Sequence, residues 1–383
     1  MEIYLDNSAT TKPYDEVVEK IVYALTKEYA NPSSIHRKGV IVEKQIKNIR
    51  KDIAKALGVK EKEIIFTSGG TEANNMAIRG IAYANKKRGN HIITTQIEHP
   101  SSLNTFKDLE NEGFEITYLD ADKKGVIDFE QLKNSIKENT ILISVMHVNN
   151  EVGSIQPIDK IGRYLKNLKN KIYFHVDAIQ SFGKIDFKVS KYNIDLLSVS
   201  GHKIHGPKGI GFIYINEKTK IKPILTGGGQ EYDLRSGTEN VPGIFGLSEA
   251  VRITTLNLEN NIQKMKSLRK LLLDEITSNI DNIKINSPED GVCHILNVSF
   301  IGTKGEILLH YLEEDNIYVS TGSACSSKKK ASHVLTAMGL SKDEIEGAIR
   351  FSLSCMNTEE EIKVAVQKLK IRVEEIRKII SKR

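Results

Sequence analysis

A lysine that follows an apolar strand-like run is the strongest chemical signal in this sequence. Lys203 comes three residues after the run 196–200 and lies within the glycine-rich and small-residue stretch Ser198 to Gly209. Desolvation in a cleft favours the neutral amine, which is the form that attacks an aldehyde to make a Schiff base. Most lysines of a lysine-rich chain are solvated, so Lys203 by itself could equally be a surface residue. The prediction that it holds an aldehyde cofactor therefore depends on the residues around it.

A glycine turn before a predicted helix offers a second signal. Residues 64–75 predict a strand, a turn at Gly69-Gly70 and a helix start, which places free backbone N–H groups and the Thr71 hydroxyl at a positive helix end. Such a site binds phosphate. A Gly-Gly turn with Thr71 as N-cap is also an ordinary way to begin a helix, so this alternative stays open. The turn is not a P-loop, because no lysine follows at the required position.

Polar side chains follow three more predicted strands. Asp177 and Gln180 close one strand, His99 follows another, and Asn150 follows a third. Ligands of open α/β sheets collect at the carboxyl ends of the strands. A buried Asp177 needs a cationic partner, and a protonated pyridine nitrogen would supply one; the alternative is an aspartate that caps the next helix. His99 could stack on a flat ring and transfer protons, although a single histidine is more often structural.

The elements that would position these residues have a βαβ rhythm. Short apolar, β-branched runs alternate with longer amphipathic segments from residue 64 to about residue 215. Runs that are apolar on both faces suit a mostly parallel sheet with helices on each side. We expect strands at 64–66, 91–95, 116–119, 141–146, 172–176, 196–200 and 210–215, with helices such as 71–88 and 100–112 between them.

A chain of 383 residues is longer than one core usually supports, so we expect two domains. After Pro242-Gly243 the pattern changes to a long helical stretch, from residue 244 to about 279, within which the second domain begins. We predict a large cofactor-binding domain, 15–255, and a small domain made of 1–14 plus 256–383. Near the C-terminus, Thr358 and Glu361 predict a capping box, and the apolar stripe from Ile362 to Ile380 predicts a core-facing helix.

Composition excludes several classes of protein. No apolar run approaches the roughly 20 residues that span a bilayer, and the N-terminus has acids where a signal peptide is basic. We therefore expect a cytoplasmic protein without a membrane partner. The net charge of +6 is small and its lysines are interleaved with acids, so direct nucleic-acid binding is not expected. Three cysteines about thirty residues apart give neither a disulfide framework nor a resident metal site.

Taken together, the order and spacing of these motifs resemble those of the pyridoxal-phosphate-dependent cysteine desulfurases of the NifS/IscS type. The similarity extends over nearly the whole chain. Besides the lysine run, it is carried by Tyr4–Thr11, Asn31–Ser34, Thr67–Glu72, Glu98-His99, Val148–Gly153 and Ile349–Leu353. The resemblance implies the fold type I of pyridoxal-phosphate enzymes, an α/β fold with a mostly parallel, doubly wound sheet and a smaller α+β domain. It also implies a homodimer.

The resemblance implies roles for the residues singled out above. Lys203 would bind the aldehyde of pyridoxal 5′-phosphate, His99 would stack on its ring, and Asp177 would pair with its pyridine nitrogen. The phosphate would be held by Gly70, Thr71, Ser200 and His202, with Thr238 reaching it from the other subunit. Gln180 and Asn150 would lie near the phenolic oxygen and the substrate. Arg350 would bind the substrate carboxylate through its planar fork, although an arginine there could instead pair with a structural acid.

The reaction is predicted from a distant cysteine. Cys325 lies in the small, polar stretch Ser320–Ser327, which suits an exposed loop, and Lys328 to Lys330 follow it, so that nearby positive charge favours the thiolate. The resemblance implies that this thiolate takes the sulfur of L-cysteine as a persulfide and releases L-alanine. The stretch resembles that of the first class of desulfurases, although the segment from Cys325 to His333 is slightly shorter and richer in lysine. Cys293 and Cys355 lack such surroundings and are predicted to be structural.

The leading hypothesis is a cysteine desulfurase that passes sulfur from Cys325 to an acceptor protein, either an iron-sulfur scaffold or a tRNA-thiolation enzyme. No metal cofactor is expected, but Cys325 could ligate a nascent cluster shared with a scaffold. An aminotransferase or a selenocysteine lyase of the same fold is the alternative among enzymes. A catalytically silent scaffold that binds a partner through Lys328 to Lys330 is the alternative from another class; intact Lys203, His99, Asp177 and Cys325 argue against it.

Overall fold

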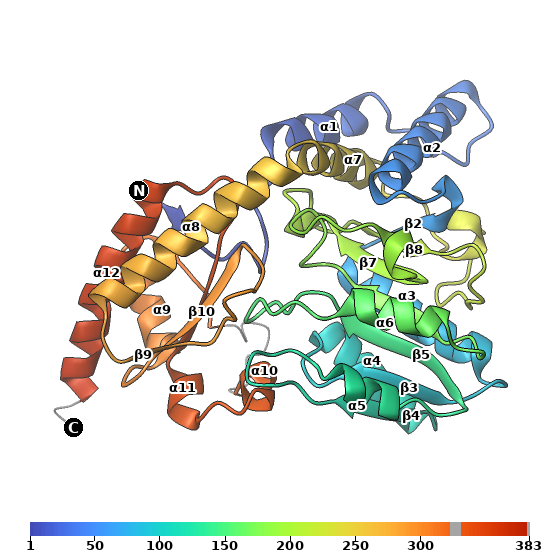
Figure 1. Ribbon diagram of the computed structural model, residues 1–383. Coiled ribbons are helices and arrows are strands. Elements are labelled where there is room, and N and C mark those ends of the chain that lie inside the picture. Colours follow the sequence, from blue (N-terminus) through green and yellow to red (C-terminus); the bar gives the residue numbers. More distant parts are fainter. Residues whose placement is uncertain (322–330, 381–383) are drawn as a thin grey trace.

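The computed structural model describes residues 1–321 and 331–380 of the chain. Figure 1 shows a large part built around one open sheet and a smaller part built around three strands, with a long helix running from one to the other. Within the described residues, no helix is both long and apolar enough to cross a membrane.

Seven strands form the large sheet, in the order β2-β8-β7-β6-β5-β3-β4. They are β2 (Ile64–Thr67), β3 (His91–Thr95), β4 (Glu115–Leu119), β5 (Thr140–Met146), β6 (Tyr173–Asp177), β7 (Leu196–Ser200) and β8 (Gly211–Ile215). Only β8 is antiparallel to its neighbours, β2 and β7, and the other pairs are parallel. The predicted α/β fold is confirmed, and each of the seven predicted strands is present with its ends shifted by at most one residue.

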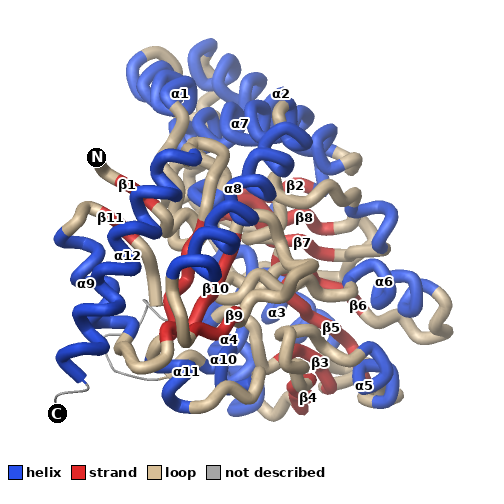
Figure 2. Tube along the Cα trace, turned by 60° about the vertical axis from the view of Figure 1, so that its left-hand side comes forward, coloured by secondary structure: helices blue, strands red, loops and turns tan. Residues whose placement is uncertain are grey.

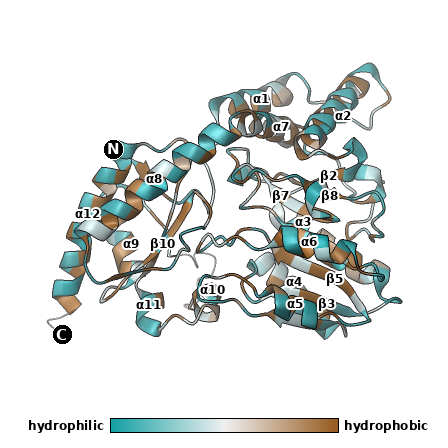
Figure 3. Cartoon of the chain, viewed as in Figure 1, coloured by the Kyte–Doolittle hydropathy of each residue, from teal (hydrophilic) through white to brown (hydrophobic). Residues whose placement is uncertain are grey.

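Helices cover both faces of this sheet because successive strand residues point to opposite sides. In β2, Ile64 and Phe66 join a core with α1, α2, α6 and α7, whereas Ile65 joins a second core with α3 and α4. The first group of helices is α1 (Asp15–Thr26), α2 (Arg37–Leu57), α6 (Ile158–Lys166) and α7 (Val241–Leu256). The second is α3 (Gly70–Asn85) and α4 (Pro100–Asn111), while α5 (Phe129–Asn134) lies near β4. In Figure 3 these strands carry hydrophobic colours and the outer helix faces are largely hydrophilic.

The sheet topology brings the ends of distant segments together. Because β2 and β7 are both antiparallel to β8, they run in the same direction as the remaining strands. The carboxyl ends of β2, β3, β5, β6 and β7 therefore lie along one edge of the sheet. The motifs that contain Gly70, His99, Asn150, Asp177 and Lys203 each follow one of these strand ends.

The smaller part is built from both ends of the chain. Strands β9 (Ile283–Ile285), β10 (Ile295–Phe300) and β12 (Ala348–Ser352) form an antiparallel sheet in the order β12-β10-β9. Beside it, β1 (Ile3–Tyr4) pairs with β11 (Ile317–Tyr318), and Figure 2 shows these two strands near α9 (Gly305–Glu314). The other helices are α8 (Leu258–Asn279), α10 (His333–Ala337), α11 (Lys342–Glu346) and α12 (Glu359–Ile380). Ile3 and Leu5 share a separate core with α8 and α12, and we therefore propose the boundaries predicted above for the two domains.

Three local predictions concern the ends of helices, and the structure corrects the first two. The long helical stretch 244–279 is two helices, because Asn257 leaves the helical conformation (φ −104°, ψ 13°) and caps α7 with a side-chain bond to Ile253 O. Helix α3 begins at Gly70, so Thr71 lies in the first turn and is not the N-cap. The capping box of α12 is present, with Thr358 and Glu361 bonded reciprocally. Its apolar stripe is buried except for Ile380, which is 40% exposed.

Candidate active site

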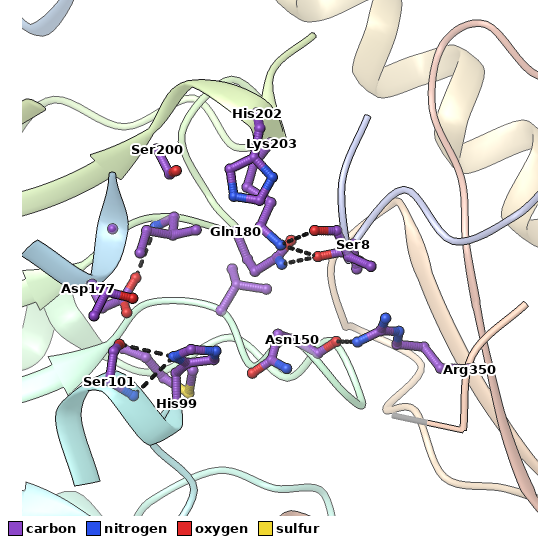
Figure 4. A pocket seen from close by; sticks show the side chains of 16 residues that line it. Ser8, His99, Ser101, Asn150, Asp177, Gln180, Ser200, His202, Lys203 and Arg350 are labelled. Carbon is purple, nitrogen blue, oxygen red and sulfur yellow. Dashed lines mark hydrogen bonds between the residues drawn. The ribbon is translucent and has the colours of Figure 1, made fainter. Parts of the chain in front are cut away.

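A cavity of about 290 Å³ lies at the carboxyl edge of the large sheet. It is lined by Ser8, Ala9, Gly70, Thr71, His99, Ser101, Met146, Val148, Asn150, Asp177, Ile179, Gln180, Ser200, His202, Lys203 and Arg350. Figure 4 shows Asp177 and Arg350 at opposite ends of this group, with Lys203, Gln180 and Asn150 between them. The structure thus gathers all the predicted site residues except Thr238, which is exposed and does not line the cavity, and Cys325, which lies outside the described residues.

Lys203 ends a short 3-10 turn, η3 (Gly201–Lys203), that follows β7. Its Nζ donates hydrogen bonds to the main-chain oxygens of Ser8 and Ala9, the latter at 2.7 Å. The carbonyl of Ser8 also accepts a bond of 2.9 Å from Gln180 Nε2. The N-terminal segment, which is far from Lys203 in sequence, therefore supplies the acceptors that hold the amine at the wall of the cavity.

The imidazole of His99 is fixed by the start of α4. As N-cap residue, it accepts at Nδ1 a bond of 3.1 Å from the Ser101 main-chain N–H, and the Ser101 hydroxyl lies 2.8 Å from the same atom. A main-chain N–H can only donate, so the neutral ring carries its proton on Nε2. Burial, followed by the positive charge of Lys203, lowers the pKa of His99 to about 4. At neutral pH His99 is therefore an uncharged flat ring, suited to stacking on an aromatic ligand.

Asp177 presents a buried carboxylate to the cavity. It accepts a bond of 2.8 Å from Asn74 Nδ2 and one of 2.9 Å from the Ile179 main-chain N–H, and burial raises its pKa. Within the described residues no lysine or arginine forms an ion pair with it, and no helix begins at Ile179 for it to cap. A buried acid that meets only neutral donors has room for a cationic ligand atom, such as a protonated pyridine nitrogen.

The opposite side of Lys203 has the donors that a phosphate group needs. Helix α3 begins at Gly70, where first-turn N–H groups point outward, and the side chains of Thr71, Ser200 and His202 lie around it. A Cβ at Gly70 would lie 2.2 Å from Ile179 Cδ1, so only glycine fits here without movement. Burial, and then Lys203, lower the pKa of His202 to about 4. The donor set and the shape both fit a phosphorylated pyridine aldehyde.

Arg350 lies at the far end of the cavity, on β12 of the small domain. Its Nη2 pairs with Asp6 at 2.7 Å and its Nη1 donates to the main-chain oxygen of Asn150 at 2.9 Å. The side chain is only 4% exposed. The alternative raised from the sequence, a structural acid that pairs with Arg350, is therefore present as Asp6. Arg350 nevertheless also lines the cavity. A guanidinium has five N–H donors, so those not bonded to Asp6 and Asn150 can bind a ligand.

The segment that contains Cys325 is flanked by residues bound to the site, although Cys325 itself and Lys328 to Lys330 lie outside the described residues. Before it, Ser320 exchanges main-chain hydrogen bonds with Arg350 at 3.1 and 2.6 Å. After it, the Ser332 hydroxyl donates to the buried carboxylate of Glu151, and His333 Nε2 lies 2.9 Å from Glu98 O. These partners line the cavity or stand next to residues that do.

Sequence reasoning missed several residues that build this site. Asn74 donates to Asp177 and, at 3.0 Å, to Ser101 Oγ, which joins the acid to the His99 cap. Its position one helical turn after Gly70 places both on the same face of α3, which was a usable signal. Ser8 and Ala9 act through main-chain carbonyls, for which side-chain types give no signal. Asp6 was part of a recognised motif but had no assigned partner.

The chain is similar to known proteins over nearly its whole length. The class-V aminotransferase family matches residues 3–364. The chain is 45% identical to a cysteine desulfurase IscS of Clostridium botulinum over 372 residues, which cover 96% of this chain and 93% of that protein. The solved structure of a NifS-like protein superposes with a TM-score of 0.93 at 39% identity, covering 98% of this chain and all of that one. The structure described as SspA in complex with cysteine matches with a TM-score of 0.82 at 37% identity, covering 94% of this chain and all of its own.

Proposed function

Because the chain belongs to the class-V aminotransferase family, as a pyridoxal-phosphate-dependent cysteine desulfurase, we propose that it transfers the sulfur of L-cysteine, as a persulfide on Cys325, to an acceptor protein. The acceptor is an iron-sulfur scaffold or a tRNA-thiolation enzyme. The observation that carries the proposal is the cavity in which Lys203, His99 and Asp177 stand at one end and Arg350 at the other. Reaction at this site takes place in the cytoplasm, where thiols such as Cys293 and Cys355 stay reduced.

At the cofactor end of the cavity, different residues bind different parts of the cofactor in this proposal. When bound, pyridoxal phosphate supplies an electron sink for the bonds at the substrate Cα. Lys203 Nζ would hold its aldehyde, and before the cofactor binds, the carbonyls of Ser8 and Ala9 accept hydrogen bonds from the Lys203 amine. Asp177 would pair with the ring nitrogen, and the neutral His99 would stack on the ring. Gly70, Thr71, Ser200 and His202 would hold the phosphate.

The substrate end of the cavity contains a positively charged side chain that comes from the small domain. The guanidinium of Arg350 takes the substrate carboxylate, because Asp6 and Asn150 O fix its orientation while leaving further N–H groups. Asn150 and Gln180 lie beside the substrate. The structure of SspA in complex with cysteine is of a relative that binds this amino acid, which supports L-cysteine as the substrate here.

A second copy of the chain completes the phosphate end in this proposal. Thr238 is exposed and does not line the cavity of its own chain, so its hydroxyl is free to reach the site of a partner. A homodimer in sedimentation experiments, and weaker binding of pyridoxal phosphate by Thr238→Ala, are expected. A monomer that binds the cofactor as tightly as a dimer would overturn this part.

Sulfur transfer is tested with radiolabelled L-cysteine and matched cysteine variants. Cys325→Ser is expected to lose the labelled persulfide and the label on an added acceptor, whereas Cys355→Ser keeps both, since Cys355 lies against Tyr14 outside the cavity. Offering an iron-sulfur scaffold and a tRNA-thiolation enzyme separately identifies the acceptor class. If Cys325→Ser formed the labelled persulfide and labelled the acceptor as well as the wild type does, Cys325 would not be the sulfur carrier.

A further inference from the structure

Lys184 is a buried lysine to which the reaction described above gives no role. It lies in the turns that follow β6 and Gln180, and it is only 7% exposed. Its Nζ donates a hydrogen bond of 2.7 Å to the main-chain oxygen of Lys203. The ammonium group is therefore bound directly to the backbone of the residue proposed to hold the cofactor.

The surroundings of Lys184 do not neutralise its charge. Within the described part of the chain no carboxylate lies within 4.0 Å of Nζ. Burial lowers the pKa of Lys184 to about 8. The titratable groups around it are Tyr14, His202, Lys203, His205, Cys293, His294 and Cys355. A small cavity of about 20 Å³ is lined by Tyr14, His205 and Cys355 of this cluster together with Lys184 and Lys203. Burial of an unpaired cation destabilises a fold, so its presence here calls for a functional reason.

The positive charge of Lys184 changes the pKa of neighbouring side chains. Lys184 is one of the positive charges that lower the pKa of His202, of His205 and of His294, in each case after the larger effect of burial. The hydrogen bond to the Lys203 carbonyl places the same charge beside the main chain of that residue. A nearby cation disfavours a second positive charge, and this is how enzymes make a lysine nucleophilic at neutral pH.

We propose that Lys184 is a positioning residue for Lys203, which anchors the main chain of Lys203 through its carbonyl and favours the uncharged form of the Lys203 nitrogen. The inference rests on the proposed role of Lys203 as the cofactor anchor. It assigns Lys184 two separable contributions, a hydrogen-bond donor and a positive charge. Glutamine at this position keeps an N–H donor without the charge, and arginine keeps both.

The test is a pH titration of the visible absorption of the protein loaded with pyridoxal phosphate. Removing a positive charge raises the pH at which the cofactor-bound Lys203 nitrogen loses its proton. Lys184→Gln is expected to raise the midpoint by about one pH unit, and Lys184→Arg to stay near the wild type. Lys188→Gln is the matched control, because Lys188 is an exposed lysine four residues further on. An unchanged midpoint in Lys184→Gln with the cofactor bound would overturn the proposal.

A second measurement applies if Lys184→Gln binds too little cofactor for its absorption to be titrated. A lysine with a lowered pKa binds fewer protons in the folded than in the unfolded protein, so its contribution to stability rises with pH between about 8 and 10.5. The melting temperature of the apoprotein should therefore rise over this range, relative to Lys184→Gln. Parallel pH profiles of the two proteins would show that the Lys184 ammonium is not desolvated in the fold, and would overturn the proposal. Retention of the cofactor absorption by Lys203→Ala would instead refute the proposed role of Lys203, whatever Lys184 does.

Discussion

The side-chain amide of Asn74 donates a hydrogen bond of 2.8 Å to the buried carboxylate of Asp177. Its second donated bond, 3.0 Å to Ser101 Oγ, continues to His99 Nδ1. One amide thus orients both the acid proposed to pair with the ring nitrogen and the histidine proposed to stack on the ring. Residues from β6, α3 and the start of α4 are held in one network.

Substitution of Asn74 should weaken cofactor binding. Asn74→Ala removes a donor from the Asp177 carboxylate, which disfavours its charged form and hence its pairing with a cationic ring nitrogen. The dissociation constant of pyridoxal phosphate should rise by about tenfold or more, the usual effect of losing a hydrogen bond to a charged group. Asn85→Ala is the matched control, because its side chain bonds Ile81 O and Lys220 O at the other end of α3, outside the network. Equal affinities in the two variants would contradict this role.

Glu98 gives a prediction for the pH dependence of stability. Its side chain accepts bonds from Thr95 and from the Met146 N–H, and burial raises its pKa to about 8. The folded protein therefore binds more protons than the unfolded chain between about pH 4.5 and 8, so this group loses its stabilising effect as the pH rises through that range. Glu98→Gln mimics the protonated acid and does not titrate. The apoprotein of this variant should gain stability relative to the wild type from pH 5 to pH 8, by on the order of 2 kcal/mol.

The measurement is the free energy of unfolding in denaturant at both pH values. Glu43→Gln, a substitution at an exposed glutamate on α2, serves as control and should show no such change with pH. A difference between Glu98→Gln and the wild type that is the same at pH 5 and pH 8 would show that Glu98 is ionised in the folded protein.

Arg350 should affect ligands with a carboxylate selectively. Arg350→Gln removes the charge proposed to bind the substrate carboxylate, so affinity for the product L-alanine should fall by about tenfold to a hundredfold. Cysteamine, which has no carboxylate, should bind with nearly unchanged affinity. Arg252→Gln is a suitable control, because that arginine lies on the surface of α7 and pairs with Glu249. Equal losses for both ligands would indicate that Arg350 acts only through its structural pair with Asp6.

The sequence was sufficient for those parts of the fold that depend on hydrophobic pattern. Strands β2, β3, β5, β6, β7 and β8 are buried on both faces, and the partly exposed edge strand β4 has β-branched residues, so their positions were predicted to within one residue. The break at Asn257 was not predicted, although the β-branched residues Ile253 to Thr255 before it favour a helix only weakly and were a usable signal.

Site residues were predictable where a polar side chain follows a strand. His99, Asp177 and Lys203 were found in this way, since parallel strands end at one edge. Ser8 and Ala9 were not, because their main-chain carbonyls reach Lys203 only after the N-terminal segment has crossed to the large domain. The buried lysine at 184 was hidden for a similar reason: its partner is a carbonyl, and its burial results from the packing of both domains.

Formation of L-alanine from L-cysteine by Lys203→Ala tests the role of the cavity most directly. The variant, supplied with pyridoxal phosphate, should show neither the visible absorption of a lysine-bound cofactor nor alanine above background, while Lys188→Ala retains both. Its melting temperature as apoprotein should stay close to that of the wild type, which excludes unfolding as the cause. Alanine formation at the wild-type rate by folded Lys203→Ala would contradict the assignment of this cavity as the active site.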